Sequence, residues 1–299
     1  MTRTLVTGAA GFTGRYVVRA LAGLGHEVHG IVHAPDGPVP GVAQLHQADI
    51  ADLRAMTRIV ESVQPDHVIH LAAIAFVAHD DVEQIYRTNV IGTRQLLEAL
   101  GRAARAPISV LLASSANIYG NARGGQLDET APAAPANDYA VSKVAAEHVA
   151  RIYSSRVPII VSRPFNYTGR RQSESFLLPK IVAHARDRAP VMELGNLDVA
   201  RDFSDVRAIA DAYVRLLSTP AAVGQTFNIC SGRAVSLHDV IDLVSSISGH
   251  RPEIRVNPAL VRENEVSKLW GSPAKLESVI GPLKHIPLEE TLRWMLEGE

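Results

Sequence analysis

A tyrosine and a lysine four residues apart, Tyr139 and Lys143, have a spacing that could support proton transfer. If the segment after Asn137 is helical, both lie on one face, because residues i and i+4 are neighbours on a helix. A phenol with a pKa of about 10 exchanges protons poorly at neutral pH, but a nearby ammonium or an oxidised nicotinamide lowers that pKa. We therefore expect Tyr139 to act as an acid–base group, with Lys143 also within reach of the ribose hydroxyls of a cofactor.

Ser115 is the hydroxyl that could bind a substrate oxygen whose charge changes during hydride transfer. It directly follows an apolar run at residues 110–114 that predicts a strand, and parallel α/β sheets bind ligands at the carboxyl ends of their strands. A Tyr-x-x-x-Lys spacing by itself is more typical of a packed tyrosine beside a solvated lysine. Together with Ser115 and the glycine turn described next, the spacing predicts Ser115, Tyr139 and Lys143 as the catalytic residues.

A glycine-rich turn near the N-terminus, Gly8-x-x-Gly11-x-x-Gly14, joins a predicted strand at residues 4–7 to a predicted helix. Backbone N–H groups and the positive end of such a helix bind phosphate groups. Gly8 permits the tight turn, Gly11 lets the backbone approach a pyrophosphate, and Gly14 lets helix and strand pack closely. Three glycines can also form a turn without a ligand, but their position between strand and helix favours a dinucleotide site. The residues expected to contact the cofactor here are Gly8, Gly11, Phe12 and Thr13.

Apolar, β-branched runs alternate with helical patterns along the first half of the chain, which favours a parallel sheet with helices on both faces. Further strands are expected at residues 28–32, 67–72, 110–114 and 159–162, and helices at residues 90–100, after Asn137, and from Ser236 to a stop at Gly249. The predicted fold class is α/β, a doubly wound parallel sheet with a smaller C-terminal α/β substrate domain. We place the cofactor domain at residues 1–165 and the substrate domain at residues 166–299, with part of residues 203–231 returning to the sheet.

The composition restricts the partners that the protein can have. The 299 residues include 30 basic and 31 acidic side chains, so neither a nucleic acid nor a membrane surface is an expected partner. No apolar stretch reaches the length of a membrane span, and Met1-Thr2-Arg3 leads directly into a strand, so no signal peptide is expected. A single cysteine, Cys230, excludes an internal disulfide and fits a reducing compartment, so we expect a cytoplasmic protein. The histidine spacings predict no metal site.

The order of these and other motifs resembles that of the extended short-chain dehydrogenases/reductases over nearly the whole chain. The motifs are Thr7-Gly8-x-x-Gly11-x-x-Gly14, Asp49-Ile50, His70-Leu71-Ala72-Ala73, Asn89-Val90-x-Gly92-Thr93, Ser115-x-x-x-Tyr119-Gly120 and Tyr139-x-x-x-Lys143. The resemblance implies a Rossmann domain that binds NAD(P), with the adenine beside Asp49 and Ile50. The other cofactor contacts that it implies are Leu71, Ala72, Ala73 and Asn89. It also implies a homodimer, or a dimer of dimers, formed through the helices that carry residues 89–100 and 139–153.

The end of the second predicted strand, Val32-His33, bears on the choice of cofactor. A site that prefers NAD places Asp or Glu there, on the ribose 2′-hydroxyl. His33 has no negative charge that would repel a 2′-phosphate, and Arg15 after the glycine turn could help to bind one. We therefore expect NADP(H) to be favoured and NAD(H) to be tolerated.

The second half of the chain resembles the branch of this family that acts on GDP-mannose derivatives. The expected substrate contacts are Asn166 in Arg163-Pro164-Phe165-Asn166-Tyr167-Thr168-Gly169, Lys180 in Leu178-Pro179-Lys180, Asn196 and Arg201 in Gly195-Asn196-Leu197-Asp198-x-x-Arg201, and Arg262 and Glu265. Guanidinium groups could bind a diphosphate and Glu265 a ribose or base, although either arginine alone is more typical of a surface ion pair. The sequence departs from the reductases of this branch, with Tyr167 in place of His and Arg170-Arg171 in place of Pro-Gly. A GDP-sugar is the expected substrate.

Asn117 distinguishes between two reactions of that branch. Dehydratases of this kind carry Glu two places after the catalytic Ser or Thr, as the base that deprotonates C5, whereas the amide of Asn117 cannot accept a proton at neutral pH. We therefore expect reduction of GDP-4-keto-6-deoxy-mannose to GDP-rhamnose or its C4 epimer, with Asn117 in the substrate site. Two alternatives stay open: a nucleotide-sugar 4-epimerase that holds NAD tightly, and a non-catalytic regulator that senses NAD(P).

Overall fold

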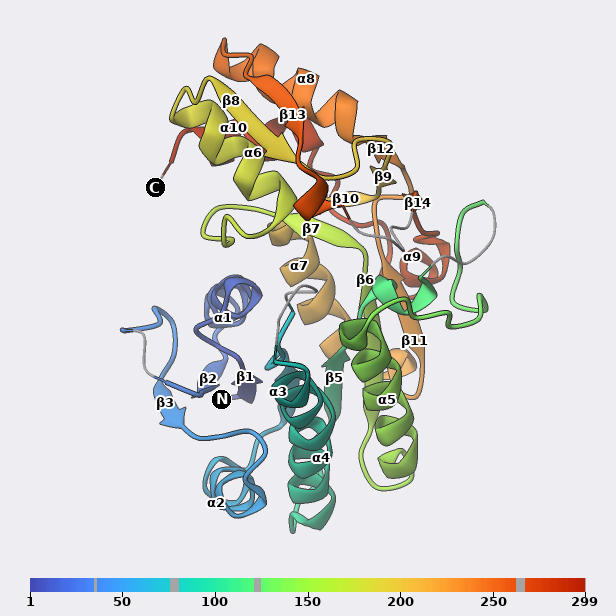
Figure 1. The fold of residues 1–299 in the computed structure, drawn as a ribbon. Helices are drawn as coiled ribbons and strands as arrows, with labels where there is room; N and C mark the ends of the chain where they lie inside the picture. The colour runs from blue at the N-terminus through green and yellow to red at the C-terminus, as the bar shows by residue number, and fades with distance from the viewer. Residues whose placement is uncertain (35–36, 76–80, 121–124, 262–266, 299) are drawn as a thin grey trace.

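A parallel sheet of seven strands forms the centre of the protein, in the order β11-β6-β5-β4-β1-β2-β3 (Figure 1). The structure is a computed structural model that describes residues 1–34, 37–75, 81–120, 125–261 and 267–298. The sheet strands are β1 (Arg3–Thr7), β2 (Glu27–Val32), β3 (Gln44–Gln47), β4 (His67–His70), β5 (Ser109–Ala113), β6 (Ile159–Pro164) and β11 (Thr226–Ile229). The predicted α/β fold class with a doubly wound parallel sheet is confirmed.

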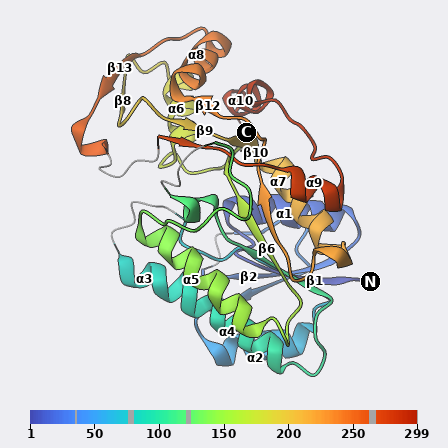
Figure 2. The same cartoon turned by 90° about the vertical axis from the view of Figure 1, so that its right-hand side faces the viewer.

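Helices cover both faces of this sheet (Figure 2). On one face, α1 (Phe12–Gly23), α7 (Val206–Leu217) and α9 (Ala274–Ile280) share an apolar core with the strands. On the other face, α2 (Leu53–Val63), α4 (Thr93–Arg102) and α5 (Asp138–Tyr153) form a second core. The central strands are buried on both faces, which explains their continuous apolar runs.

The edge strand β3 was not predicted from the sequence. Its residues Gln44–Gln47 are polar except for Leu45 and are only partly buried, and they pair in parallel with β2 from His29 to Val32. An edge strand has only one neighbour and can carry polar side chains, so it lacks the apolar signal that marks the central strands.

The predicted helix at residues 90–100 is divided in the structure. A short helix α3 (Val82–Tyr86) continues into a π-helical turn, Arg87–Gly92, before α4 begins at Thr93. Apolar periodicity does not reveal a change in the hydrogen-bonding pattern of the backbone. The helix predicted after Asn137 is α5, and the Asn137 side chain accepts a hydrogen bond from the Ala140 N–H at 2.9 Å.

The second half of the chain has its own apolar core. It lies between α6 (Leu177–Arg186), α8 (Leu237–Ser248), α10 (Leu288–Leu296) and the paired strands β8 (Val191–Leu194) and β13 (Glu253–Val256). Short ladders complete it: β7 (Asn166–Thr168) with β10 (Phe203–Asp205), and β9 (Ala200–Arg201) with β12 (Val235–Ser236) and β14 (Lys268–Leu269). β11 lies beside β6 in the large sheet, and the domain boundary at residue 165 stays a prediction.

Two predicted signals at the ends of α8 have the expected geometry. Ser236 and Asp239 form a capping box at its start, and Gly249 ends it with a φ of 64°. Across the described ranges, none of the helices is both long and apolar enough to cross a lipid bilayer.

Candidate active site

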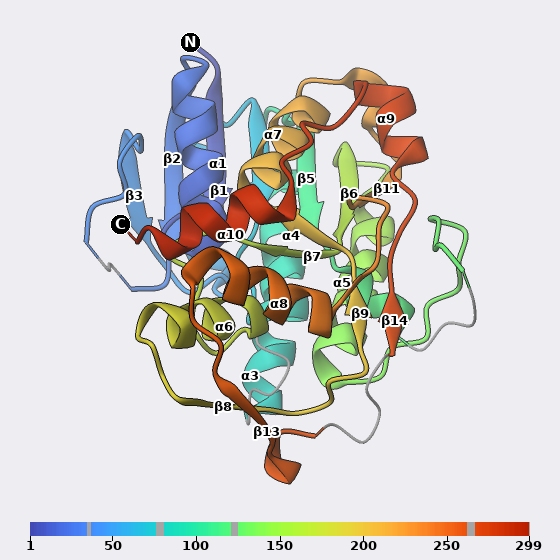
Figure 3. The same cartoon turned by 90° about the horizontal axis from the view of Figure 1, so that it is seen from above.

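A cleft of about 1310 Å³ lies between the carboxyl ends of the sheet strands and the elements of the second half. Figure 3 looks onto α6, α8 and α10, which lie over this end of the sheet. The cleft exceeds the range of about 300–1,000 Å³ that is typical for one small ligand, so a dinucleotide and a sugar nucleotide can share it. The predicted site residues that line it are Gly8, Gly11, Phe12, Thr13, His33, Asp49, Ile50, Leu71, Ala72, Ala73, Ser115, Asn117, Tyr139, Lys143, Asn166, Asn196 and Arg201.

The glycine turn leaves no room for side chains at its centre. Gly8 has a φ of +69°, and a Cβ atom added there would lie 3.0 Å from the Ala72 nitrogen. A Cβ on Gly14 would lie 2.1 Å from the Gly8 carbonyl oxygen. Gly14 therefore allows a close approach of the helix to the turn, whereas the sequence had suggested a close approach to the strand. In the described part of the chain, no side chain caps the first turn of α1. The turn therefore fits a pyrophosphate, which its backbone N–H groups can bind.

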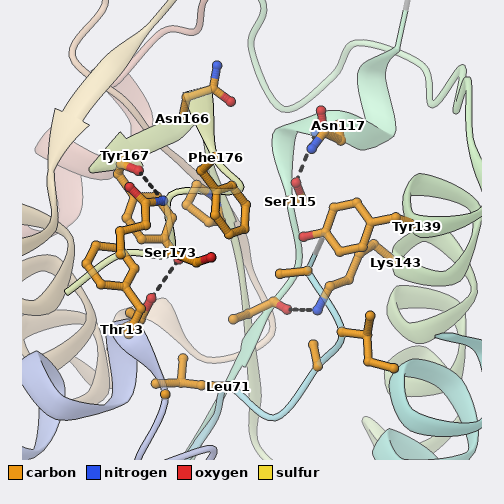
Figure 4. Close-up of a pocket in the computed structure, with 18 of the residues that line it drawn as sticks. Thr13, Leu71, Ser115, Asn117, Tyr139, Lys143, Asn166, Tyr167, Ser173 and Phe176 are labelled. Atoms are coloured by element: carbon orange, nitrogen blue, oxygen red, sulfur yellow. Dashed lines mark hydrogen bonds between the residues drawn. The ribbon is translucent and has the colours of Figure 1, made fainter. Parts of the chain in front are cut away.

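The catalytic side chains predicted from the sequence come together at the end of β5 (Figure 4). The Ser115 hydroxyl oxygen accepts a hydrogen bond from the Asn117 N–H at 3.1 Å. Lys143 Nζ donates to the Ala113 carbonyl oxygen at 2.9 Å and lies 5.9 Å from the centre of the Tyr139 ring. Tyr139 and Lys143 share one face of α5, and both are buried. The arrangement places a hydroxyl, a phenol and an ammonium beside the cleft.

Burial controls the ionisation of the phenol and the ammonium. It raises the pKa of Tyr139 to about 12, although a hydrogen bond with Ser115 opposes the rise. The lower pKa expected from the sequence is not found, because removal from water disfavours the phenolate. Burial also lowers the pKa of Lys143 to about 8, and the nearby Glu147 carboxylate opposes this change. Tyr139 is therefore protonated near neutral pH, as a proton donor must be.

Asp49, the residue expected beside the adenine, is held by two hydrogen bonds. Its carboxylate accepts from the Ala51 N–H at 2.8 Å and from Arg87 at 2.8 Å. The backbone bond, followed by the Arg87 side chain, holds the pKa of this carboxyl below its usual value. Arg87 also lines the cleft. Its hydrogen bond to Asp49 could not be predicted from a local sequence pattern, because the two residues are 38 positions apart.

Asn89 lies behind the cleft wall and is not among the residues that line it. Its side-chain oxygen accepts from the Ile74 N–H at 2.8 Å, and its nitrogen donates to the Ile74 carbonyl at 3.1 Å and to the Ser142 hydroxyl at 2.9 Å. Asn89 thus joins the segment after β4 to α5. Its contact with a cofactor stays a prediction.

One predicted substrate contact, Lys180, does not line the cleft, and two others cannot be placed. Lys180 Nζ donates to the carbonyl oxygen of Glu193 at 2.7 Å, and Lys180 does not line the cleft. Arg262 and Glu265 lie outside the residues that the structure describes. The roles of all three remain predictions.

Tyr167 was noted in the sequence only as a departure, yet it connects the two walls of the cleft (Figure 4). Its hydroxyl lies 2.8 Å from the Thr13 hydroxyl of α1, and its ring stacks on Phe12 with centroids 6.0 Å apart. Tyr213 of α7 also lines the cleft. No local pattern indicated the hydrogen bond between Thr13 and Tyr167, because these residues are 154 positions apart in the chain.

Comparison with known proteins agrees with this geometry. A family model described as GDP-mannose 4,6 dehydratase matches residues 5–295. GDP-6-deoxy-D-talose 4-dehydrogenase from Aggregatibacter actinomycetemcomitans is 33% identical over 93% of this chain and 91% of its own length. The chain belongs to the extended short-chain dehydrogenase/reductase family.

Other members of this family resemble the chain over nearly its whole length. GDP-6-deoxy-D-mannose reductase from Pseudomonas aeruginosa is 33% identical, over 98% of this chain and 96% of its own. A Burkholderia cenocepacia J2315 protein, provisionally an epimerase, has a TM-score of 0.92 and 48% identity, covering 99% of this chain and 97% of its own. RMD from Pseudomonas aeruginosa, solved with NADPH, has a TM-score of 0.86 and 31% identity, covering 99% and 98%. The predicted family and enzyme class, an oxidoreductase, are confirmed.

Within the family, the name of the matching model does not decide which reaction this chain catalyses. Asn117 lines the cleft beside Ser115, at the position where the dehydratases are expected to carry Glu. In the described ranges, no three His, Cys, Asp or Glu side chains gather into a group that could hold a metal ion.

Proposed function

We propose that the protein reduces the 4-keto group of a GDP-4-keto-6-deoxy-hexose, forming GDP-rhamnose or its C4 epimer. The observation that carries this proposal is the buried, protonated Tyr139 beside Ser115 and Lys143, with an amide rather than a carboxylate at Asn117. Such a site has a proton donor and an oxygen-binding hydroxyl but lacks a base for dehydration at that position. The two relatives named for GDP-6-deoxy-sugars, each 33% identical, support the choice of substrate class.

NADPH is the cofactor that we favour, with NADH tolerated. The glycine turn and the uncapped start of α1 fit a pyrophosphate, and His33 lines the cleft after β2 without a repelling negative charge. The likeness to RMD, solved with NADPH, supports this preference. When bound, the reduced nicotinamide would supply the hydride. Gly8, Gly11, Thr13, Ala72 and Ala73 would hold the dinucleotide.

The chain's own residues would then complete the reduction. The Ser115 hydroxyl would bind the C4 oxygen, and the Tyr139 phenol would donate its proton to that oxygen as negative charge develops there. Lys143, held by the Ala113 carbonyl, would stabilise the resulting phenolate and bind ribose hydroxyls.

The test is incubation of the protein with GDP-4-keto-6-deoxy-mannose and NADPH, with NMR of the product. We expect oxidation of NADPH and a GDP-6-deoxy-hexose that carries a hydroxyl at C4. Absence of reaction here, together with activity on a UDP- or dTDP-linked sugar, would overturn the guanine assignment.

A nucleotide-sugar 4-epimerase is the second candidate, and the likeness to the provisional epimerase at 48% identity favours it. An epimerase oxidises and then re-reduces C4, so its NAD stays bound through the cycle. An absorbance spectrum of the purified protein separates the two candidates: stoichiometric bound NAD supports the epimerase, and its absence supports the reductase.

We also infer a homodimer or a dimer of dimers formed through α4 and α5. Apolar side chains are exposed on α5 and on the π-helical turn that leads into α4, with Val141, Ile152 and Ile91 at 38%, 71% and 41% exposure. A reducing, cytoplasmic compartment is part of this proposal, based on the single cysteine. Sedimentation of the wild type and of Ile152→Glu tests the interface, because a buried charge should shift the variant toward monomer.

A further inference from the structure

A buried ion pair joins α5 to β6 behind the catalytic side chains. Glu147, one helical turn after Lys143, and Arg163, near the end of β6, are 5% and 7% exposed. Arg163 donates to the two carboxylate oxygens of Glu147 at 2.9 and 2.7 Å. Buried charges are tolerated only when they are paired and hydrogen-bonded, so the fold must hold these two groups in good geometry.

Glu147 reaches the catalytic strand end through Ser114. The Ser114 hydroxyl donates to a Glu147 carboxylate oxygen at 2.6 Å. Ser114 stands between Ala113, whose carbonyl accepts the hydrogen bond of Lys143, and Ser115. The Glu147 carboxylate therefore holds residues 113–115, which carry both the carbonyl that binds Lys143 and the Ser115 hydroxyl.

Arg163 is fixed from its other side by Tyr119. Its guanidinium donates to the Tyr119 hydroxyl at 2.9 Å and lies over that ring, 5.2 Å from the centroid. The Tyr119 hydroxyl donates in turn to the side-chain oxygen of Asn228 in β11 at 2.7 Å. Because the guanidinium is bonded on both sides, the Glu147 carboxylate is held in one position.

From this arrangement we infer that Glu147 is a positioning residue for the reaction, which orients Ser115 through Ser114 and keeps Lys143 in its cationic form. The inference rests on the proposed roles of Ser115, Tyr139 and Lys143. Neither Glu147 nor Arg163 lines the cleft, so the pair acts through other residues.

The charges around Lys143 support the second part of this inference. The ionisable groups that face it are Tyr139 and Glu147 from α5 and His70 from β4, with Arg163 of β6 behind the carboxylate. Burial raises the pKa of Tyr139 to about 12 and lowers that of His70 to about 3, so both are neutral near pH 7. Glu147 is thus the negative charge in the described surroundings that opposes the effect of burial on Lys143. Without that charge, the pKa of Lys143 would fall below about 8 and the ammonium would lose its proton closer to neutral pH.

Glu147→Gln tests the charge, because it keeps the shape of the side chain. We expect kcat to fall about 10- to 100-fold at neutral pH, and the alkaline limb of the pH–rate profile to move to lower pH. The pKa of Lys143 can be measured by NMR with carbon-13-labelled lysine, since the chain has five lysines and Lys143→Met identifies the resonance. If the Lys143 pKa and the alkaline limb of Glu147→Gln both matched those of the wild type, Glu147 would not be what keeps Lys143 cationic.

Ser114→Ala tests the positioning, because it breaks the link to Glu147 and leaves the charge in place. We expect a lower kcat with an unchanged Lys143 pKa. A wild-type kcat would overturn the positioning role, and this variant decides that question even if Glu147→Gln does not fold.

Glu98→Gln is the matched control. Glu98 is a buried glutamate of α4 that accepts from the Tyr153 hydroxyl at 2.8 Å and pairs with Arg102. Its loss should lower stability and leave kcat and the Lys143 pKa unchanged. If Glu98→Gln lowered kcat and the Lys143 pKa as much as Glu147→Gln does, the effects would reflect a general loosening of the fold, and the inference would be overturned.

The lysine titration also separates this inference from the proposed function, because it needs no substrate. If the wild type does not reduce the GDP-4-keto sugar but Glu147→Gln lowers the lysine pKa, the proposed function fails and the charge role stands. If the wild type reduces the sugar, and Glu147→Gln has the same Lys143 pKa and the same kcat as the wild type, then only the inference about Glu147 fails.

Discussion

The two walls of the cleft are built in different ways. The sheet wall consists of residues at the ends of β1, β4 and β5 and on α5, and these strands pair along their whole length within the apolar core. The opposite wall comes from β7 and β9, which have three and two residues, and from the loops around them. Buried strands within a seven-stranded sheet fix side chains more closely than isolated two- or three-residue ladders do. We therefore expect the chemistry to reside in the sheet wall and the choice of sugar in the opposite wall.

Tyr139→Phe should cause the largest effect, because it removes the proton donor of the sheet wall. We expect kcat to fall about 10²- to 10⁴-fold while NADPH binding and the unfolding temperature stay close to the wild type. Steady-state kinetics and a cofactor titration measure both quantities. A wild-type kcat would show that the phenol does not donate the proton.

Gly14→Ala should come next, since the added Cβ would lie 2.1 Å from the Gly8 carbonyl oxygen. The turn must shift, which we expect to lower stability by about 1–3 kcal/mol and to weaken NADPH binding. Gly23→Ala is the control in the same helix, because its Cβ would meet nothing within 4 Å. That change should stabilise the protein by about 0.5–1 kcal/mol and leave cofactor binding intact. Equal cofactor binding in both variants would contradict the role of the turn.

The same contrast explains how much of the site could be predicted from the sequence. The glycine turn, Ser115 and the Tyr139–Lys143 pair are local patterns next to buried strands, so their spacing indicated the place where the structure brings them together. The Arg87–Asp49 and Thr13–Tyr167 contacts join residues 38 and 154 positions apart, and no local pattern encodes them. The pKa of Tyr139 was predicted in the wrong direction, because the sequence shows the neighbouring lysine but not the depth of burial.

The buried His70 of the sheet wall should make stability depend on pH. It contacts the Thr7 and Thr93 hydroxyls at 2.7 and 2.9 Å, and burial lowers its pKa to about 3. Since the unfolded chain has a histidine pKa of about 6.5, it takes up the proton first, and stability falls as the pH drops from 6.5 toward 3. We expect this group to lower stability by about 1.4 kcal/mol at pH 5.5 relative to pH 7.5.

Urea unfolding of the wild type and of His70→Gln near pH 7.5 and 5.5 measures this dependence. The variant should lose less stability on acidification than the wild type. An identical loss in both proteins would mean that His70 does not contribute.

Tyr167→Phe should have the smallest effect, because it removes one hydrogen bond between the two walls. Loss of the bond to Thr13 should cost about 1 kcal/mol of stability and raise the KM for the sugar nucleotide, with kcat within a few-fold of the wild type. A drop in kcat as large as that of Tyr139→Phe would place chemistry in the opposite wall as well.

The most direct test of the central claim is reduction of GDP-4-keto-6-deoxy-mannose with NADPH that carries deuterium at its transferable position. If the sheet wall directs hydride to C4, NMR of the product will show one deuterium at C4 and none elsewhere in the sugar. Product without deuterium at C4, or deuterium at another carbon of the sugar, would contradict this account.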